Sequence, residues 1–118
     1  MPRIGARALR YTALLIALVT CTTSTAIARA ANWVPNPSAA GQWIDLDSRK
    51  SDDEVVRFNV SLSRDDKGQP STDEQDLVIE ILNCENGNRV MVLPMLNNDT
   101  RHLPTLSQDD PLFRLICN

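Results

Sequence analysis

The sequence predicts an α+β fold, in which a small antiparallel β-sheet of about four to six strands is followed by a short C-terminal helix that one disulfide ties to the sheet. Three observations support this prediction. Apolar and polar residues alternate from Val55 to Ser63, as in a strand with one buried and one wet face. Asn86-Gly87 separates two further apolar segments, which is a strong sign of a β-hairpin. Two cysteines, Cys84 and Cys117, follow a chain start with the pattern of an export signal.

The first thirty residues have the three parts of a secretory signal peptide. Three early arginines precede an apolar run from Tyr11 to Val19, and a stretch of small residues ends in Ala28-Arg29-Ala30. The apolar run is shorter than the roughly 20 residues that a membrane-spanning helix needs. We therefore expect residues 1–30 to be a cleavable signal peptide, cut after Ala30 or, as a second choice, after Ala28. Residues 31–118 are expected to form one exported domain.

A lipoprotein signal is the alternative. Leu18-Val19-Thr20-Cys21 has the hydrophobic positions of a lipobox, but Thr20 stands where Gly, Ala or Ser is usual. An acyl chain on Cys21 would tether the same domain to a membrane and leave its fold unchanged. Membrane attachment is therefore expected only if Cys21 is lipidated.

Removal of residues 1–30 leaves a strongly acidic domain. The whole chain has 12 Lys and Arg residues and 15 Asp and Glu residues. Four of the arginines and none of the acidic residues lie in the signal, so residues 31–118 have a net charge of −7. The sequence also lacks a basic stripe with interleaved aromatic residues. Nucleic acid is therefore excluded as a partner.

The two cysteines that remain after cleavage are expected to form one structural disulfide. An 88-residue domain has a marginal core, and small exported domains often add disulfides for this reason. Cys84 and Cys117 lack the C-x-x-C spacing of a redox pair, and they are too few and too far apart for a structural zinc site. The bridge would stabilise the domain by about 3.5–4 kcal/mol on the chain-entropy estimate.

Four strands are predicted from the hydrophobic pattern. In the clearest one, every second residue from Val56 to Leu62 is apolar and is expected to face the core, with Ser61 on the wet side. The strand that ends at Cys84 has apolar residues on both sides, Ile79 among them, so both of its faces are expected to be covered. The four strands are expected at residues 42–47, 55–63, 76–84 and 89–93.

The segments between the strands are predicted as loops. Residues 31–41 are expected to form an irregular lead-in with Trp33 capping one end of the core, and residues 48–54 a charged turn. Residues 64–75 contain no apolar residue, which predicts a mobile surface loop. Residues 95–106 are ambiguous, with room for a short edge strand before Asn97.

A short helix is predicted at the end of the chain. Ser107 to Asp110 matches a helix-start pattern, and Pro111 is tolerated in a first helical turn. The helix would have an apolar side made of Leu112, Phe113, Leu115 and Ile116.

No catalytic residue, metal site or cofactor site is predicted. The pair Asp45 and Asp47 is the candidate for a small hydrolase or a cation site, but a solvated strand face is the simpler explanation. The clusters 52–54 and 109–110 fit a turn and a helix N-terminus, while His102 has no second histidine or cysteine beside it. A domain of this size leaves little room for a pocket, so we expect a non-enzymatic protein.

Several segments follow one another in a recognisable order. They are Trp33-Val34-Pro35, Ile44-Asp45-Leu46-Asp47-Ser48, Val55-Val56-Arg57-Phe58-Asn59-Val60, a strand that ends at Cys84, Asn88-Arg89-Val90-Met91-Val92-Leu93 and the terminal Leu115-Ile116-Cys117. Together they resemble the surface-adhesin protein E family of Gram-negative bacteria over essentially all of residues 31–118. The chain departs from the family in the residues before Cys84, where an aromatic and an aspartate are frequent, and in its acidity.

The resemblance implies an antiparallel sheet with a disulfide-tied C-terminal helix, in agreement with the pattern above. It also implies an adhesin-like domain of the periplasm or the outer cell surface, which binds a host matrix or serum protein or a bacterial envelope protein and which can form a homodimer. The alternative is a periplasmic inhibitor or accessory factor of an envelope enzyme or complex, with the loop 64–75 as the inserted element. No ligand-binding residue matches a family motif, so none is assigned.

Overall fold

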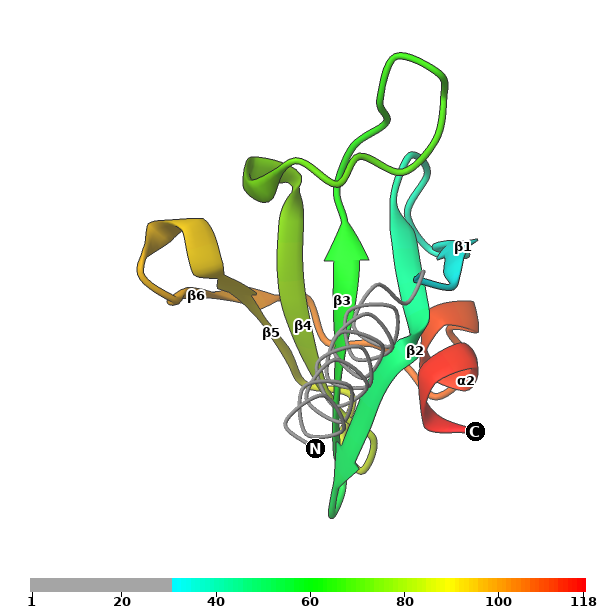
Figure 1. Cartoon of the computed structure of the whole chain (residues 1–118). Coiled ribbons are helices and arrows are strands. Elements are labelled where there is room, and N and C mark those ends of the chain that lie inside the picture. The colour runs from blue at the N-terminus through cyan, green and yellow to red at the C-terminus, as the bar shows by residue number, and fades with distance from the viewer. Residues whose placement is uncertain (1–30) are drawn as a thin grey trace, which may run out of the picture. The chain divides into compact units, whose positions relative to one another are not determined.

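Six strands form one antiparallel sheet in which each strand pairs with its neighbours in the sequence (Figure 1). The structure is a computed structural model that describes residues 31–118, so the predicted signal peptide and Cys21 lie outside the described residues. In chain order the elements are β1 (Trp33–Pro35), β2 (Trp43–Asp52), β3 (Val55–Ser61), η1 (Glu74–Asp76), β4 (Leu77–Asn83), β5 (Arg89–Leu93), η2 (Pro94–Leu96), β6 (Asp99–Leu103) and α2 (Pro111–Cys117). The predicted sheet with a short C-terminal helix is confirmed.

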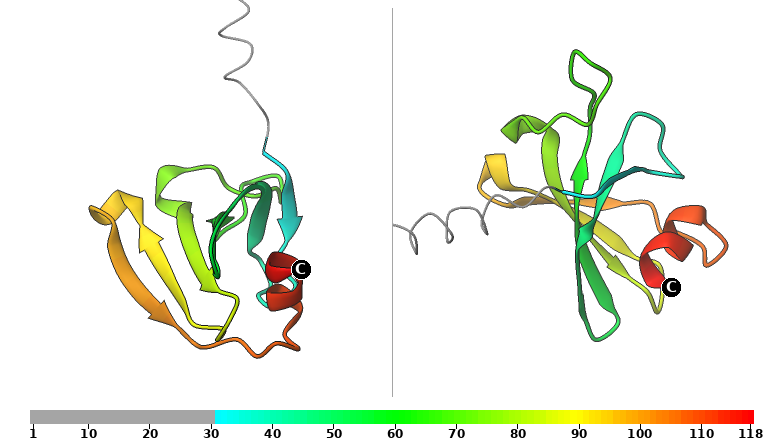
Figure 2. Two further views of the ribbon diagram at one scale, coloured as in Figure 1. Left: turned by 90° about the horizontal axis from the view of Figure 1, so that it is seen from below. Right: turned by 45° about the vertical axis from the view of Figure 1, so that its right-hand side comes forward.

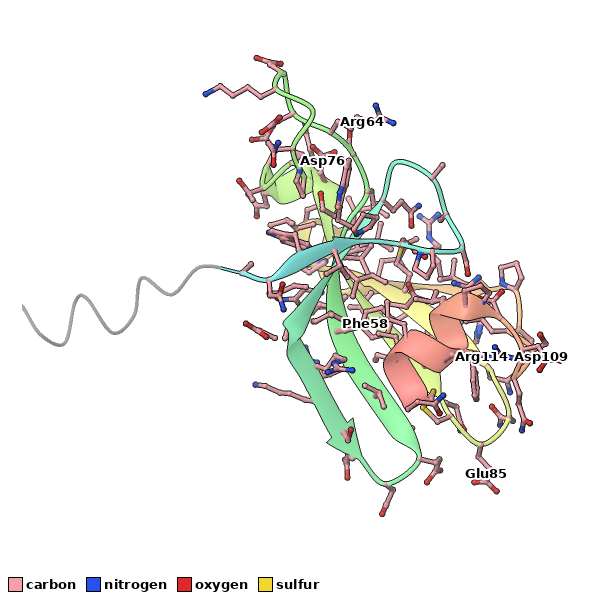
Figure 3. All side chains as sticks on the ribbon, turned by 90° about the vertical axis from the view of Figure 1, so that its right-hand side faces the viewer. Phe58, Arg64, Asp76, Glu85, Asp109 and Arg114 are labelled. Carbon is pink, nitrogen blue, oxygen red and sulfur yellow. A yellow bond between two sulfur atoms is a disulfide. The ribbon has the colours of Figure 1, made fainter. Side chains whose placement is uncertain are left out.

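The core lies on one side of this sheet, which we call the core face. Alternate residues of β3 and β4 point to it, and α2 packs against it through its predicted apolar side. Figure 3 shows Phe58 in the interior beside the helix. None of the helices among residues 31–118 is long and apolar enough to cross a membrane. The buried apolar residues are Ile44, Val56, Phe58, Val60, Val78, Leu82, Leu106, Leu112, Phe113 and Ile116.

Ser61 departs from the expected alternation because a loop folds over it. The sequence places it on the wet side of β3, but the residue has no exposed surface. Its hydroxyl group donates a hydrogen bond to the carbonyl oxygen of Ser71 at 2.7 Å, and Ser71 in turn donates to the Asp76 carboxylate at 2.6 Å. The loop 64–75 is at the surface as predicted, and these bonds hold its base against the sheet.

β2 is longer than predicted because it contains a wide bulge. The segment 48–54 was expected to be a turn, but pairing with β3 resumes at Lys50 and continues to Asp52. Within the bulge, the Ser48 hydroxyl accepts a hydrogen bond from the backbone N–H of Asn59 at 2.8 Å and donates one to the carbonyl oxygen of Asp45 at 2.6 Å. The side chain replaces the missing ladder bonds, so the strand passes through the irregularity.

The expected irregular lead-in contains an edge strand instead. β1 pairs with β2, and Val34 lies opposite the fully buried Ile44. Pro35 is tolerated because β1 is the edge of the sheet. Since neighbouring residues of a strand point to opposite faces, Trp33 lies on the side away from the core. The expectation that Trp33 caps the core is therefore wrong.

The segment after β5, which the sequence leaves ambiguous, has its edge strand after Asn97 and not before it. The residues before Asn97 form the 3-10 turn η2, and the edge strand β6 comes after it. Asn97 and Asn98 both have positive φ, at 54° and 60°. Asparagine tolerates this left-handed conformation better than most residues, and two such residues in succession reverse the chain into β6.

After β6 the chain runs along the sheet to reach α2 (Figure 2). On the way Leu106 enters the core, and its backbone N–H donates to the carbonyl oxygen of Gly87 at 3.0 Å. Gly87 belongs to the β4–β5 hairpin that the Asn-Gly pair predicts, and its φ is +78°. A Cβ atom at this position would lie 2.0 Å from the carbonyl oxygen of Leu106. Glycine is therefore required here twice, for the turn and for the close approach.

The predicted helix is present, but it begins three residues later than the pattern from Ser107 to Asp110 predicts. Asp110 is the N-cap, and its carboxylate accepts a hydrogen bond from the backbone N–H of Leu112 at 2.9 Å. The hydroxyl group of Ser38, in the loop between β1 and β2, donates to the same carboxylate oxygen at 2.5 Å. The hydrogen bond from Ser38 and those from the helix N–H groups hold the pKa of Asp110 below its ordinary value.

The predicted disulfide joins the end of the helix to the sheet. Cys84 follows β4 directly and is bonded to Cys117, with 5.7 Å between their Cα atoms. The bridge closes a loop of 33 residues. The helix is thus fixed at both ends. Ser38 bonds to the Asp110 cap at its start, and the disulfide ties its end to β4.

Substitution of Gly87 tests the close approach to Leu106. We expect Gly87→Ala to lower the free energy of unfolding by more than about 2 kcal/mol, because the backbone must both take up a strained φ and move away from Leu106. The matched control is Gly68→Ala, which has a similar φ of +77° but open space around it and should cost about 1 kcal/mol. Urea unfolding monitored by tryptophan fluorescence measures both. Equal losses would contradict the packing role of Gly87.

Removal of the disulfide tests its share of the stability. We expect the double variant Cys84→Ser, Cys117→Ser to lose about 3.5–4 kcal/mol of unfolding free energy, since the open chain gains conformational entropy when unfolded. Reduction of the wild-type protein should give the same loss. Peptide mapping by mass spectrometry without reductant should find one linked peptide pair, and free thiols on both cysteines would contradict the structure.

Candidate protein-binding face

The side of the sheet opposite the core carries an apolar surface of its own. The strand register shows which residues share this side, which we call the open face. α2 and Leu106 both pack on the core face, so the expectation that both faces of β4 are covered is not met within residues 31–118. The residues that the register places on the open face are Trp33, Pro35, Trp43, Asp45, Lys50, Asp52, Val55, Arg57, Asn59, Ser61, Leu77, Ile79, Ile81, Asn83, Val90, Val92, Thr100 and His102.

The centre of the open face is a continuous apolar stripe along β4 and β5. The stripe consists of Leu77, Ile79, Ile81, Val90 and Val92, and all five are half-buried. Ile79 lies opposite Val92 and Ile81 opposite Val90, so the side chains form neighbouring cross-strand pairs. These contacts shield the side chains only partly, and contiguous apolar surface of this kind marks interaction sites on soluble proteins.

Two hollows deepen the open face at the ends of the stripe. The first has a volume of about 400 Å³ and is lined by Trp33, Leu77, Ile79, Pro94 and the nearby Thr72 and Glu74. The second has a volume of about 510 Å³ and includes Val55, Ile81, Val90 and His102. Both are open to solvent and mainly apolar, which suits protruding side chains of a protein partner.

Exposed basic residues border the stripe. Arg57 of β3 lies directly opposite Ile81 on one side and Lys50 of β2 on the other, and His102 of β6 lies opposite Val90. One row across the sheet therefore reads Lys50, Arg57, Ile81, Val90 and His102. Within residues 31–118, neither Lys50 nor Arg57 forms an ion pair, although the domain is strongly acidic.

Many of the acidic residues lie at the two ends of the sheet. The loop 64–75 contains Asp65, Asp66, Asp73 and Glu74, and the opposite end contains the β2–β3 turn at 53–54 and Glu85. Figure 3 shows Glu85 far from the loop that carries Arg64. Lys50 and Arg57 therefore give one border of the stripe exposed positive charge in an acidic domain.

A buried ion pair beneath the stripe fixes the two strands that carry it. Glu80 lies between Ile79 and Ile81 in β4 but points to the core face, where only 4% of its surface is exposed. Its Oε1 atom accepts a hydrogen bond from Nη1 of Arg89 at 3.0 Å. The Arg89 Nε atom also donates to the carbonyl oxygen of Pro104 at 2.8 Å. β4, β5 and the segment after β6 are thereby held together.

The pKa of Glu80 reflects its burial. Desolvation raises the pKa above its ordinary value, and the hydrogen bond and positive charge of Arg89 oppose this rise. A raised pKa means that Glu80 favours folding most at low pH, and this contribution is lost as the pH rises through the folded-state pKa. Arg89 reduces that loss by stabilising the carboxylate.

A small cavity of about 180 Å³ adjoins this ion pair on the core face. Asn36, Gln42, Met91 and Leu103 line it together with Glu80 and Arg89. Ligand pockets usually exceed about 300 Å³, so the cavity suits ordered water.

Of the two acidic residues considered as a candidate site in the sequence, Asp45 has a structural role. Asp45 is buried, and its Oδ1 atom accepts hydrogen bonds from the backbone N–H groups of Asn32 at 2.9 Å and Asp47 at 3.1 Å. Asp47 is exposed. The carboxylate of Asp45 thus stabilises the start of the bulge in β2. Among residues 31–118 no group of three or more histidine, cysteine or acidic side chains is arranged to hold a metal.

Sequence reasoning missed the open face and the Glu80–Arg89 pair. A signal for the pair was present, because Glu80 shares its side of the strand with Val78 and Leu82, both core residues. Arg89 is likewise on the side of Met91. Two opposite charges at core positions of hairpin-linked strands indicate a buried pair. His102 is exposed, and its place on the open face follows only from the register.

Comparison with known proteins finds no match: no family model, no curated protein and no solved structure matches this chain. The resemblance to the surface-adhesin protein E family therefore rests on the sequence pattern alone and stays a prediction.

Replacement of Arg89 tests the ion pair. We expect Arg89→Met to lower the unfolding free energy at pH 7 by roughly 3–5 kcal/mol, because Glu80 is left buried and charged without a partner. The loss should shrink as the pH falls, since protonation of Glu80 removes the buried charge. Chemical unfolding at pH 7 and pH 4.5 measures this difference.

Two further variants control for other effects of losing Arg89. The double variant Arg89→Met, Glu80→Gln should be more stable than Arg89→Met at pH 7 and should lack its pH dependence. Arg101→Met breaks the exposed pair with Asp99, whose side chains are 58% and 52% exposed, and should cost about 0–1 kcal/mol. A loss for Arg89→Met that is independent of pH would refute the role assigned to Glu80.

Proposed function

We propose that this chain is an exported, non-enzymatic protein-binding domain of the bacterial cell envelope, of the surface-adhesin E kind, and that it binds its partner through the open face. The observation that carries the proposal is the apolar stripe of β4 and β5, which no helix or loop of residues 31–118 covers. A sheet that is apolar on both faces normally has a layer packed on each face. A partner protein supplies the missing layer.

Export is part of the proposal because of the first thirty residues and the disulfide. The basic start, the apolar run and the small-residue cleavage pattern belong to a signal peptide. The Cys84–Cys117 bridge suits the oxidising conditions outside the cytoplasm. The periplasm or the outer cell surface is therefore the proposed location, and the family resemblance favours a host matrix or serum protein as partner.

A periplasmic inhibitor or accessory factor is the second candidate, and the loop 64–75 favours it. Figure 1 shows this loop projecting beyond the end of the sheet. It is internally organised: the Asp65 carboxylate accepts hydrogen bonds from the backbone N–H groups of Lys67 at 2.8 Å and Gln69 at 2.9 Å. A pre-organised projecting loop loses less entropy when it enters the site of another protein.

A pull-down experiment with residues 31–118 tests the proposal. The domain is offered to envelope extract of the source organism and to host matrix and serum proteins. We expect saturable capture that Ile79→Ser weakens roughly tenfold, because the substitution removes a central side chain of the stripe. The matched control is Leu96→Ser, which alters an apolar residue that is 51% exposed and lies in η2, and it should leave capture unchanged.

The identity of the captured protein separates the two candidates. A host protein supports the adhesin, whereas a bacterial envelope enzyme whose capture depends on the loop 64–75 supports the inhibitor. Equal capture by wild type and Ile79→Ser would exclude the open face as the binding surface. Melting temperatures of all variants establish that each remains folded.

A further inference from the structure

The arrangement of charge on the open face points to the chemistry of its occupant. We infer that the open face binds a protein surface that is apolar in its centre and bears carboxylates at the positions facing Lys50 and Arg57. This inference rests on the proposed function and adds to it the class of partner: an acidic amphipathic segment of another protein.

Two basic residues lie directly opposite each other on neighbouring strands. Lys50 of β2 and Arg57 of β3 are cross-strand partners, and both are exposed. Side chains at such positions have Cβ atoms roughly 5 Å apart, and like charges there are destabilising. No acidic residue among residues 31–118 forms an ion pair with either of them. A like-charge cross-strand pair that forms no ion pair breaks a local rule of strand pairing, and such exceptions are expected at functional sites.

One exposed carboxylate lies close to this pair, and the others nearby are buried. Asp45 lies beside β3 on the same face, but it is buried and its Oδ1 atom accepts hydrogen bonds from backbone N–H groups. Asp52 is exposed on the same face, two residues beyond Lys50 on β2 and diagonal to Arg57, so it offsets part of the positive charge without forming an ion pair. Glu80 is on the core face, paired with Arg89. The positive charge at the border of the stripe is therefore available to a partner.

The dimensions of the stripe suit a short amphipathic element. From Leu77 to Ile81 it extends for four residue steps, about 14 Å at the rise of a strand. A helix of roughly nine residues covers this length, and the hollows at the two ends accept its larger side chains. Acidic residues along one edge of such an element would meet Arg57 and Lys50.

The net charge of the domain predicts a preference for basic peptides, whereas the local charge of Lys50 and Arg57 predicts a preference for acidic ones. The inference is therefore testable. The domain as a whole has a net charge of −7 and attracts basic peptides at long range. At about 0.15 M salt the Debye length is about 8 Å, so contact with Lys50 and Arg57 decides the preference at the open face. An acidic peptide should then bind better than a basic one.

Two synthetic amphipathic peptides of roughly 20 residues, long enough to form helix, serve as probes. They share one leucine face and differ only in having Glu or Lys on the polar face. Trp33 and Trp43 are the two tryptophans of the chain, and both lie on the open face, so their fluorescence reports binding. The protein used is residues 31–118, which contain the complete core and the disulfide. We expect the Glu peptide to bind to it roughly three- to tenfold more tightly than the Lys peptide.

Charge-reversal variants locate the effect. Arg57→Glu should abolish or invert the preference for the Glu peptide. The control Arg64→Glu makes the same change of net charge in the loop 64–75 and should leave the preference intact. Ile79→Ser should weaken both peptides equally, because it alters the stripe and leaves the basic border unchanged.

Each other outcome overturns the inference. Preference for the Lys peptide, or binding of neither, refutes an acidic occupant, while capture that depends on Ile79 still supports the proposed function. A fluorescence change with phosphatidylcholine or anionic lipid vesicles, but with neither peptide, would identify a membrane as the occupant instead. Loss of both peptide binding and Ile79-dependent capture would refute the proposed function itself.

Discussion

The guanidinium group of Arg89 joins three separate parts of the chain, and the rest of the structure depends on that junction. It lies in β5, pairs with Glu80 of β4 and donates to the carbonyl oxygen of Pro104 in the segment after β6. The neighbouring Gly87 lets the backbone of Leu106 approach the β4–β5 turn. Cys84, at the start of that turn, binds the end of the helix. The turn end of the β4–β5 hairpin thus holds the segment after β6 and α2 against the core face.

This concentration of ties on one side determines what the other side can do. The helix, the segment after β6 and the disulfide all stabilise the core face, while the stripe on the open face contributes only cross-strand contacts between half-buried residues. Substitutions on the open face are therefore expected to have little effect on folding. β4 contributes to both faces, because Glu80 and Leu82 point to the core and Ile79 and Ile81 lie on the open face.

The elements that were predictable are those determined by local pattern. Alternation located the central strands, Asn86-Gly87 located their hairpin, and the pattern from Ser107 to Asp110 located the helix to within one turn. The features that were missed depend on contacts between residues far apart in the sequence. β1 forms because Val34 pairs with Ile44 across a loop. The bulge in β2 is stabilised because the Ser48 hydroxyl accepts a hydrogen bond from the backbone N–H of Asn59. The open face itself appears only when the register brings strands together.

Charge placement also determines which partner the open face avoids. Two copies brought together through this face would oppose one domain of charge −7 to another. The Lys50 and Arg57 side chains would then meet a surface with few exposed carboxylates, because on each open face Asp45 is buried and Asp52 is exposed. The desolvation of basic groups in excess of their carboxylate partners opposes such a dimer. The same residues on which the proposal of an acidic partner rests therefore oppose self-association through the apolar stripe.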